Sequence, residues 1–314
     1  MTTFLTAGII RTALELGMIY SLVALSLFIS FSILDICDLS TDGCYTFGCA
    51  VGAIVTIAGH PLLGILASVV AGVCSGLVTA LLQTRFGVQS ILAGIIVNTG
   101  LYTVNLAVMG FSSNVSIFGT DTVFTLFGGL SSSPFWAEWS RLILLAGILL
   151  VVCLFINWFL KTRLGLSIRA TGDSMAMIRA SSINPGIMIV VGLCFSNALT
   201  GLAGSLVGQY NKTCDINLGT GMVTIALASL IIGETLMGKR KMSMRILGVV
   251  IGSCLYRFII SLALRLNVPT EAFKLVSAII VAVAIAAPEA QKMLAFQGRK
   301  NAALRKRRAN GEVQ

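Results

Sequence analysis

The chain has 314 residues, of which 56% are hydrophobic and 11% charged, and its mean hydropathy is +0.95. A soluble domain has about 45–50% apolar and about 25% charged residues, so this composition excludes a soluble protein and predicts an integral membrane protein. The 22 lysines and arginines exceed the 12 acidic residues, which gives a net charge of +10.

Apolar runs recur along the whole chain and predict an all-α, polytopic membrane protein of about 8–10 transmembrane or broken helices. The polar stretches between them are too short for a soluble domain, so residues 1–314 are expected to form one transmembrane domain. In chain order the runs are Gly17–Leu34, Tyr45–Gly59, Leu62–Leu82, Ile91–Gly110, Leu142–Leu160, Gly186–Val207, Met222–Leu236, Leu247–Leu264 and Leu275–Ala287.

Basic residues are concentrated in Lys161–Arg179, in Lys239–Arg245 and in the tail 288–314. The positive-inside rule places these three segments, and with them the C-terminus, in the cytoplasm. Following the runs from these segments places Phe111–Arg141 and Asn211–Thr220 on the outside. The aromatic residues near the end of the first outer segment can meet a soluble partner or anchor the chain at the membrane interface, and the anchor is favoured.

The stretch Gly233–Lys241 reads GETLMGKRK and is similar to the phosphate-binding pattern G-x-x-x-x-G-K-[ST]. Arg240 stands where that pattern needs a hydroxyl group to bind magnesium, and apolar runs flank the stretch on both sides. We therefore predict a basic turn, and we expect any ATP to be hydrolysed by another polypeptide. His60 is the only histidine and the eight cysteines include no C-x-x-C pair, so no metal site is predicted.

Two segments on opposite faces of the membrane are similar to each other. Ile36–Gly59 and Thr213–Gly233 both contain Cys-Asp, then a polar stretch, then a short apolar run. Five apolar runs separate the two Cys-Asp pairs, and an odd number of crossings inverts the second segment. The sequence thus predicts inverted repeats at approximately 17–110 and 186–287, an arrangement in which the substrate route runs between the halves.

Each repeat contains a predicted helix break, Asp38–Gly43 in the first and Asp215–Gly221 in the second. Their Gly, Ser, Thr and Asn residues weaken helices, and the start of a half-helix presents free N–H groups that suit an anion. The alternative is that they are loops of matching composition. Asp35, Asp38 and Asp42 fall on the inner side without basic neighbours, which is explained if the first break dips into the membrane.

Polar residues in the breaks and on one face of the fourth run are the candidates for the lining of the route. Asn98, Tyr102 and Asn105 are spaced by four and three residues and so share a helix face, although hydrogen bonds between helices would explain them equally well. The full set is Asp38, Ser40, Thr41, Asp42, Gly43, Asn98, Tyr102, Asn105, Asp215, Asn217 and Thr220.

The segment 161–185 joins two apolar runs and is predicted to contain a short helix from Met175 to Ser182. Its start has the capping residues Gly172, Asp173 and Ser174, and Asn184-Pro185 ends it. An apolar knob with one charge would result and would suit a partner's groove, whereas an ordinary basic loop is the alternative. The knob consists of Met175, Met177, Ile178 and Arg179.

The stretch TRLGLSIRATGDSMAMIRASSI (Thr162–Ile183) resembles the coupling segment of permease subunits of ABC importers in the branched-chain amino acid and ribose class. ILDICDLSTDGCYTFGCAVGA (Ile33–Ala53), ILAGIIVNTGLYTVNLAVMG (Ile91–Gly110) and ALTGLAGSLVGQ (Ala198–Gln209) are most similar to its tryptophan/tyrosine-type branch. The resemblance covers nearly the whole chain.

This resemblance implies a permease dimer, with a homodimer expected, in a bacterial inner membrane. It implies two cytoplasmic ABC ATPase subunits that bind ATP and magnesium and grip Gly172–Ser182, and an extracellular solute-binding lipoprotein. The permease itself would bind no cofactor and no nucleic acid, and would import an amino acid, with an aromatic one expected, or a similar small solute.

The competing interpretation is a secondary transporter or channel driven by an ion gradient, since inverted repeats occur there as well. It requires buried carboxylates within the spans, and only Glu15 and Glu234 are candidates. Arg257 also lies in an apolar run, so it and Glu234 each need a partner or water.

Overall fold

The structure is a computed structural model that describes residues 7–130, 134–238 and 241–265, together with residues 279, 282 and 286. Six of its helices are long and apolar enough to cross a membrane, and two shorter apolar helices accompany them. The prediction of an all-α polytopic membrane protein is confirmed. In chain order the helices are α1 (Ala7–Leu27), η1 (Phe28–Ile33), α2 (Thr41–Ile57), α3 (Pro61–Thr84), α4 (Ser90–Val108), α5 (Val123–Gly128), α6 (Pro134–Phe159), α7 (Arg163–Asp173), α8 (Met175–Ala180), α9 (Pro185–Asn211), α10 (Met222–Met237) and α11 (Met242–Arg265).

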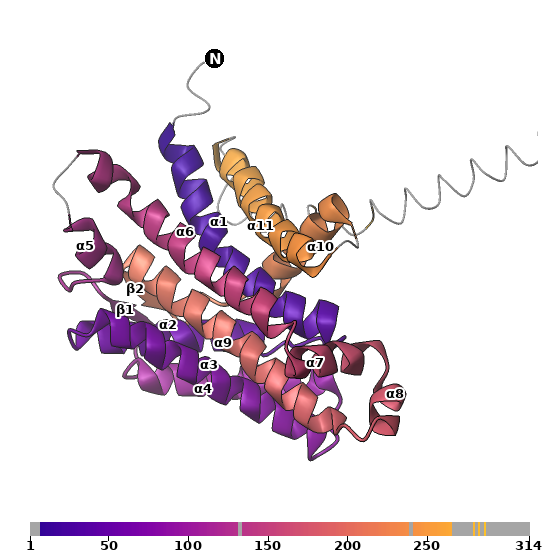
Figure 1. Ribbon diagram of the computed structural model, residues 1–314. Coiled ribbons are helices and arrows are strands. Elements are labelled where there is room, and N and C mark those ends of the chain that lie inside the picture. The colour runs from indigo at the N-terminus through magenta and orange to yellow at the C-terminus, as the bar shows by residue number, and fades with distance from the viewer. Residues whose placement is uncertain are drawn as a thin grey trace, which may run out of the picture.

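Helix α9 lies in the centre of the bundle and packs against α1, α2 and α3 (Figure 1). Small residues allow this close packing. A Cβ atom on Gly201 would collide with the backbone oxygen of Ser68 in α3, and one on Gly204 would collide with that of Tyr45 in α2. Helices in lipid associate through such close contacts, because lipid supplies no hydrophobic drive toward a partner helix.

The first helix break is visible where η1, a short π-helix, ends. Asp35 has a positive φ of 56°, and the chain then turns back and starts α2 at Thr41. Asp38 in this return segment bonds Asn197, which lies near the middle of the 27-residue helix α9. The return segment therefore reaches the middle of the bundle, as the dip into the membrane required. The predicted break was too long, because Thr41, Asp42 and Gly43 already form the first turn of α2.

The second break lies between β2 (Thr213–Asp215) and α10. Gly221 has a φ of 85°, which suits a glycine, and α10 starts directly after it. The strand was not predicted. It pairs antiparallel with β1 (Asn114–Ser116), so that Val115 lies opposite Cys214. The pairing joins the segment after α4 to the segment after α9, and we call this side of the bundle the ribbon end.

Helices α7 and α8 cover the opposite side, which we call the α7 end (Figure 1). Thr84 at the end of α3 lies beside Gly186 at the start of α9 there. At the ribbon end the Gln209 amide of α9 donates to the Pro61 oxygen of α3 at 3.2 Å. Helices α3 and α9 therefore run antiparallel over the full depth of the bundle.

Several predictions fall on residues that the structure does not describe. They concern the last apolar run, most of residues 266–287 in the second repeat, the tail 288–314, and Lys239 with Arg240 in the GETLMGKRK stretch. The described part of that stretch ends α10 and leads into the turn before α11.

Candidate translocation cavity and coupling helices

A polar cavity of about 310 Å³ lies where α2, α4 and the loop before α10 meet. Seven of the eleven predicted route residues line it together, and Thr46, Thr99 and Ile216, which the sequence analysis did not select, complete the lining. The seven are Asp42, Gly43, Asn98, Tyr102, Asn105, Asn217 and Thr220.

Asp42 connects the two short helices at this cavity. Its carboxylate accepts hydrogen bonds from the backbone N–H groups of Gly221 at 3.0 Å and Val223 at 2.8 Å. These are free donors at the start of α10, so the acidic side chain caps the second short helix from the first turn of the first. The Thr46 hydroxyl adds a further bond by accepting from the Gly219 N–H at 3.0 Å. The two helix starts thus meet at one wall of the cavity.

Helix α4 supplies the amide side chains of the cavity. Asn105 is 1% exposed and donates from Nδ2 to the Gly43 oxygen at 3.1 Å. Its Oδ1 atom is buried and has no hydrogen-bond partner among the described residues. The sequence offered interhelical hydrogen bonding and lining of the route as alternatives for this residue. The Asn105 side chain both bonds α2 and lines the cavity.

The cavity opens on a polar face of α4. Tyr102 is 52% exposed, and Thr99 and Thr103 are exposed beside it. The Thr99 hydroxyl donates to the Ile95 oxygen of its own helix at 2.9 Å.

Three predicted route residues lie behind the cavity instead of lining it. The Asp38 carboxylate accepts from the Ser40 N–H and hydroxyl at 2.8 and 2.6 Å and from the Asn197 amide at 2.7 Å. Thr41 donates to the Asp38 backbone oxygen at 3.0 Å. A carboxylate with this many donors is satisfied in place, so the group fixes the return segment to α9. Asp215 is also outside the cavity, where it accepts from the Asn217 N–H at 2.8 Å and closes a turn.

The segment at the α7 end forms two helices where one was predicted. Thr162 caps α7 and accepts from Gly165 at 3.3 Å, and Ser174 caps α8 and accepts from Met177 at 3.4 Å. Ser174 therefore has the predicted role, whereas Gly172 and Asp173 end the unpredicted helix α7. Asn184 starts α9 by accepting from Gly186 at 2.9 Å.

Helix α8 presents only part of the predicted knob. Met175 and Met177 are 42% and 53% exposed, and Arg179 is exposed as well. Ile178 is only 3% exposed and packs against the rest of the bundle. The exposed surface therefore consists of two methionines and one positive charge, and Ile178 anchors the helix.

Gly172 places α7 against the end of η1. A Cβ atom at this position would collide with the Ile33 backbone oxygen and approach Leu34 at 3.0 Å. Ile33 directly precedes the return segment that leads to Asp38 and α2. A displacement of α7 would therefore act on the segment that carries Asp42 to the cavity.

The remaining charged residues within the spans have partners. Glu234 accepts from Arg245 at 2.6 Å and from Ser32 at 2.7 Å. The guanidinium group of Arg257 lies 3.5 Å from the centre of the Tyr20 ring. Glu234 and Arg257 therefore do not pair with each other.

Glu15 is 2% exposed and bonds Arg11 at 3.2 Å and Tyr210 at 2.8 Å. Its two carboxylate oxygens are thus both occupied, one by a basic group and one by a phenol. Glu15 and Glu234, the two candidates that the ion-driven interpretation offered, therefore both have partners.

The family comparison identifies the protein class. The model of the branched-chain amino acid transport system permease component matches residues 9–285. The chain belongs to this permease family. Its members are permease subunits of ABC importers, which favours the importer over the ion-driven alternative.

Relatives are similar to the permease over most of their length. A tyrosine transport system permease protein of Clostridioides difficile (strain R20291) is 33% identical over 276 residues, which cover 88% of the permease and 89% of the relative. An uncharacterized protein, RP368, of Rickettsia prowazekii (strain Madrid E) is 29% identical over 282 residues, with coverage of 88% and 97%. The ribose import permease protein RbsC of Escherichia coli (strain K12) is 26% identical over 258 residues, with coverage of 79% and 75%. No solved structure matches the permease.

Proposed function

We propose that the permease is the membrane subunit of an ATP-driven, binding-protein-dependent importer for an aromatic amino acid. The observation that carries this proposal is that the starts of α2 and α10 and seven residues predicted from the sequence, six of them polar, meet at one cavity. The name of the tyrosine permease relative supports the aromatic substrate.

The cavity offers both kinds of group that a zwitterionic amino acid needs. The Asp42 carboxylate suits an ammonium group, and the side-chain amides of Asn98 and Asn217 can donate to a carboxylate. The exposed Tyr102 ring provides a surface against which an aromatic side chain can stack.

In this proposal ABC ATPase subunits contact Met175, Met177 and Arg179 at the α7 end, which lies in the cytoplasm of a bacterial cell with the C-terminus. The exposed basic residues Arg85 and Lys161 at that end agree with the positive-inside rule. The ATPase subunits bind ATP and magnesium. Movement of α7 reaches the cavity through Ile33 and the return segment.

A solute-binding lipoprotein delivers the substrate at the ribbon end, and the polar face of α4 meets a second copy of the permease. A homodimer places two such faces together and removes Thr99, Tyr102 and Thr103 from contact with lipid. The substrate route then runs beside this shared interface, and the two inverted repeats supply one short helix each.

The test is ATP hydrolysis by the partner ATPase, co-purified with the permease in lipid nanodiscs and measured with and without binding protein and aromatic amino acids. Met177→Asp and Arg179→Glu change the exposed surface of α8, and Arg85→Glu is the matched control because Arg85 is exposed at the same end outside α7 and α8.

We expect ligand-loaded binding protein to stimulate hydrolysis in the wild type and in the control, and the two α8 variants to lose this stimulation while remaining folded. The proposal is wrong if no ATPase associates and the purified permease alone moves solute down an ion gradient. A stimulating ligand other than an aromatic amino acid would correct the substrate.

A further inference from the structure

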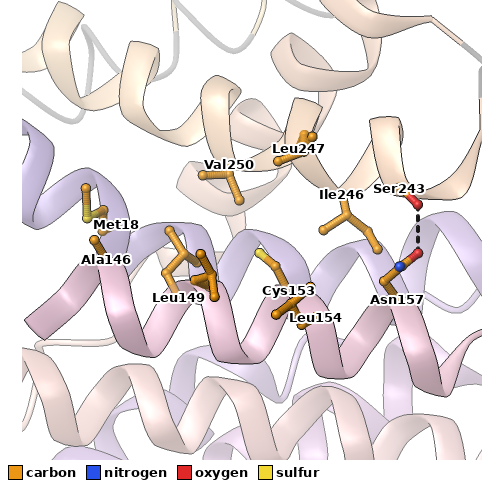
Figure 2. Close-up of a pocket in the computed structure, with 11 residues that line it drawn as sticks. Met18, Ala146, Leu149, Cys153, Leu154, Asn157, Ser243, Ile246, Leu247 and Val250 are labelled. Atoms are coloured by element: carbon orange, nitrogen blue, oxygen red, sulfur yellow. Dashed lines mark hydrogen bonds between the residues drawn. The ribbon is translucent and has the colours of Figure 1, made fainter. Parts of the chain in front are cut away.

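A second cavity, of about 370 Å³, lies between α6 and α11, and Met18 of α1 forms part of its wall. Figure 2 shows side chains from α6 and α11 that point toward each other across it. All its lining groups are apolar except at one end, where the Ser243 hydroxyl donates to Asn157 Oδ1 at 2.8 Å. Leu150, Leu154 and Leu247 in the lining are 60%, 60% and 49% exposed, so the cavity is a groove on the outer surface of the bundle.

The groove extends over one half of the membrane. Its lining on α6 runs from Ala146 to Asn157, which is about 16 Å along a helix. The hydrocarbon core of a bilayer is about 30 Å thick, so the groove matches the depth of one leaflet. Asn157 lies two residues before the end of α6, and Trp158 beside it is 62% exposed, as in the aromatic belt at a membrane interface. The polar end of the groove is therefore at headgroup level.

The narrow free space in the groove favours an extended chain over a whole helix as the group that fills it. A volume of about 370 Å³ spread over about 16 Å gives a cross-section of a few tens of Å². A helix with side chains is about 10–12 Å wide and has a cross-section of about 80–110 Å². A single extended hydrocarbon chain is the occupant of suitable width.

Exposed positive charge stands only a few residues from the polar end. Lys161 and Arg163 follow the end of α6, and Lys241 directly precedes α11. The nearby Arg245 is already paired with Glu234, whereas among the described residues the three exposed groups form no ion pair. Such basic groups at a membrane surface attract the phosphate of an anionic lipid.

We propose that this groove is a binding site for an anionic phospholipid, with one acyl chain against Leu149, Cys153 and Val250 and the phosphate held by Lys161, Arg163 and Lys241. The lipid joins α6 to α11 in the leaflet at the α7 end. It stabilises the arrangement of these two helices beside their hydrogen bond between Ser243 and Asn157. The site lies apart from the translocation cavity and does not depend on which substrate the permease carries.

The test uses the full permease in nanodiscs that contain equal amounts of phosphatidylglycerol and phosphatidylcholine. Lipids retained after transfer to detergent are counted by native mass spectrometry. Lys161→Gln with Lys241→Gln removes two surface charges, Cys153→Trp fills the groove, and Arg85→Gln is the matched control with an exposed basic residue at the same end.

We expect the wild type and the control to retain phosphatidylglycerol at least fivefold over phosphatidylcholine. The double lysine variant should lose this preference, and Cys153→Trp should retain neither lipid. The lysine variant changes only exposed side chains, so it tests the site even if Cys153→Trp does not fold. Unchanged retention in the lysine variant overturns the proposal, and conversion of a dimer to a monomer by Cys153→Trp without loss of lipid would assign the groove to a second copy of the chain.

Discussion

The carboxylate of Asp42 caps the start of α10 from the first turn of α2, with Oδ1 of Asp42 2.8 Å from the backbone nitrogen of Val223. The two residues are 181 positions apart, and no other carboxylate in the described residues joins one short helix to the start of the other. The bond fixes one wall of the translocation cavity.

Loss of this carboxylate should loosen the cavity wall. Asp42→Ala leaves the donors of Gly221 and Val223 without their acceptor, so we expect a loss of about 1–3 kcal/mol in the free energy of unfolding. Asp42→Asn keeps an acceptor oxygen, so its loss in the free energy of unfolding should be about 1 kcal/mol smaller than that of Asp42→Ala. Unfolding in mixed micelles measures both. Asp215→Ala, which removes an acceptor from a turn near the surface, is the control, and an equal cost for the Asp42 and Asp215 variants would contradict the interhelical role.

Substrate uptake should be reduced less by polar replacements of the cavity-lining residues than by apolar ones. Asn98→Leu and Asn217→Leu each remove an amide group from the lining. Each should lower the uptake of an aromatic amino acid into proteoliposomes that contain the complete transporter by at least about tenfold, because a hydrogen bond to a charged ligand is lost. Asn98→Gln should retain more uptake than Asn98→Leu. The control is Thr235→Leu, an exposed residue near the end of α10 and outside the cavity. Uptake that is equal in the leucine variants and the control would exclude this cavity from the route.

The close packing of α9 against α3 should depend on the absence of a side chain at Gly201. A valine at this position collides with the Ser68 backbone oxygen, and backbone cannot move aside as a side chain can. We expect Gly201→Val to abolish the monodisperse peak in fluorescence-detected size-exclusion chromatography. Gly147→Val is the matched control, because nothing lies within 4 Å of the added Cβ in α6. A normal peak for Gly201→Val would show that α9 can move away from α3.

The stabilisation that Arg257 provides should depend on the ring of Tyr20 and not on the Tyr20 hydroxyl group. The guanidinium lies over the ring, and the Arg257 Nε atom is buried without a hydrogen-bond partner in the described residues. A desolvated cation–π contact contributes about 2 kcal/mol, so Tyr20→Leu should lower the free energy of unfolding by that amount while Tyr20→Phe stays within about 0.5 kcal/mol. Equal losses in the two variants would assign the stabilisation to the hydroxyl group.

The sequence predicted the helices and much of the cavity because both depend on local pattern. Long apolar runs identified α3, α4 and α9, and the Cys-Asp segments identified the two helix starts. Asn98, Tyr102 and Asn105 could be grouped because their spacing places them on one face of a helix.

The structure differs from the sequence predictions where contacts between residues far apart in the chain determine the local structure. Asp38 was assigned to the route, but Asn197, 159 positions away, satisfies its carboxylate behind the cavity. The β1 and β2 strands are three residues each and form only because the ends of α4 and α9 are neighbours. The helix α7 was missed because Gly172, Asp173 and Ser174 were assigned to the start of a single helix. Gly172 instead lies in the last turn of α7, where the lack of a Cβ atom allows the contact with Ile33.

The contact between Gly172 and Ile33 should transmit the movement of the coupling helices. Gly172→Ala adds a methyl group against the Ile33 backbone oxygen and must shift α7 or the end of η1. Because the substitution alters neither the exposed methionines of α8 nor a residue of the cavity lining, we expect the ATPase to remain bound and the basal hydrolysis to persist. Stimulation by ligand-loaded binding protein should fall at least about tenfold, equivalent to about 1.4 kcal/mol of coupling. Gly147→Ala serves as the control, because it adds the same methyl group in α6 at a position where nothing lies within 4 Å. If Gly172→Ala keeps full stimulation while its altered packing is evident from a lower melting temperature, the signal reaches the cavity by a path that does not include Ile33.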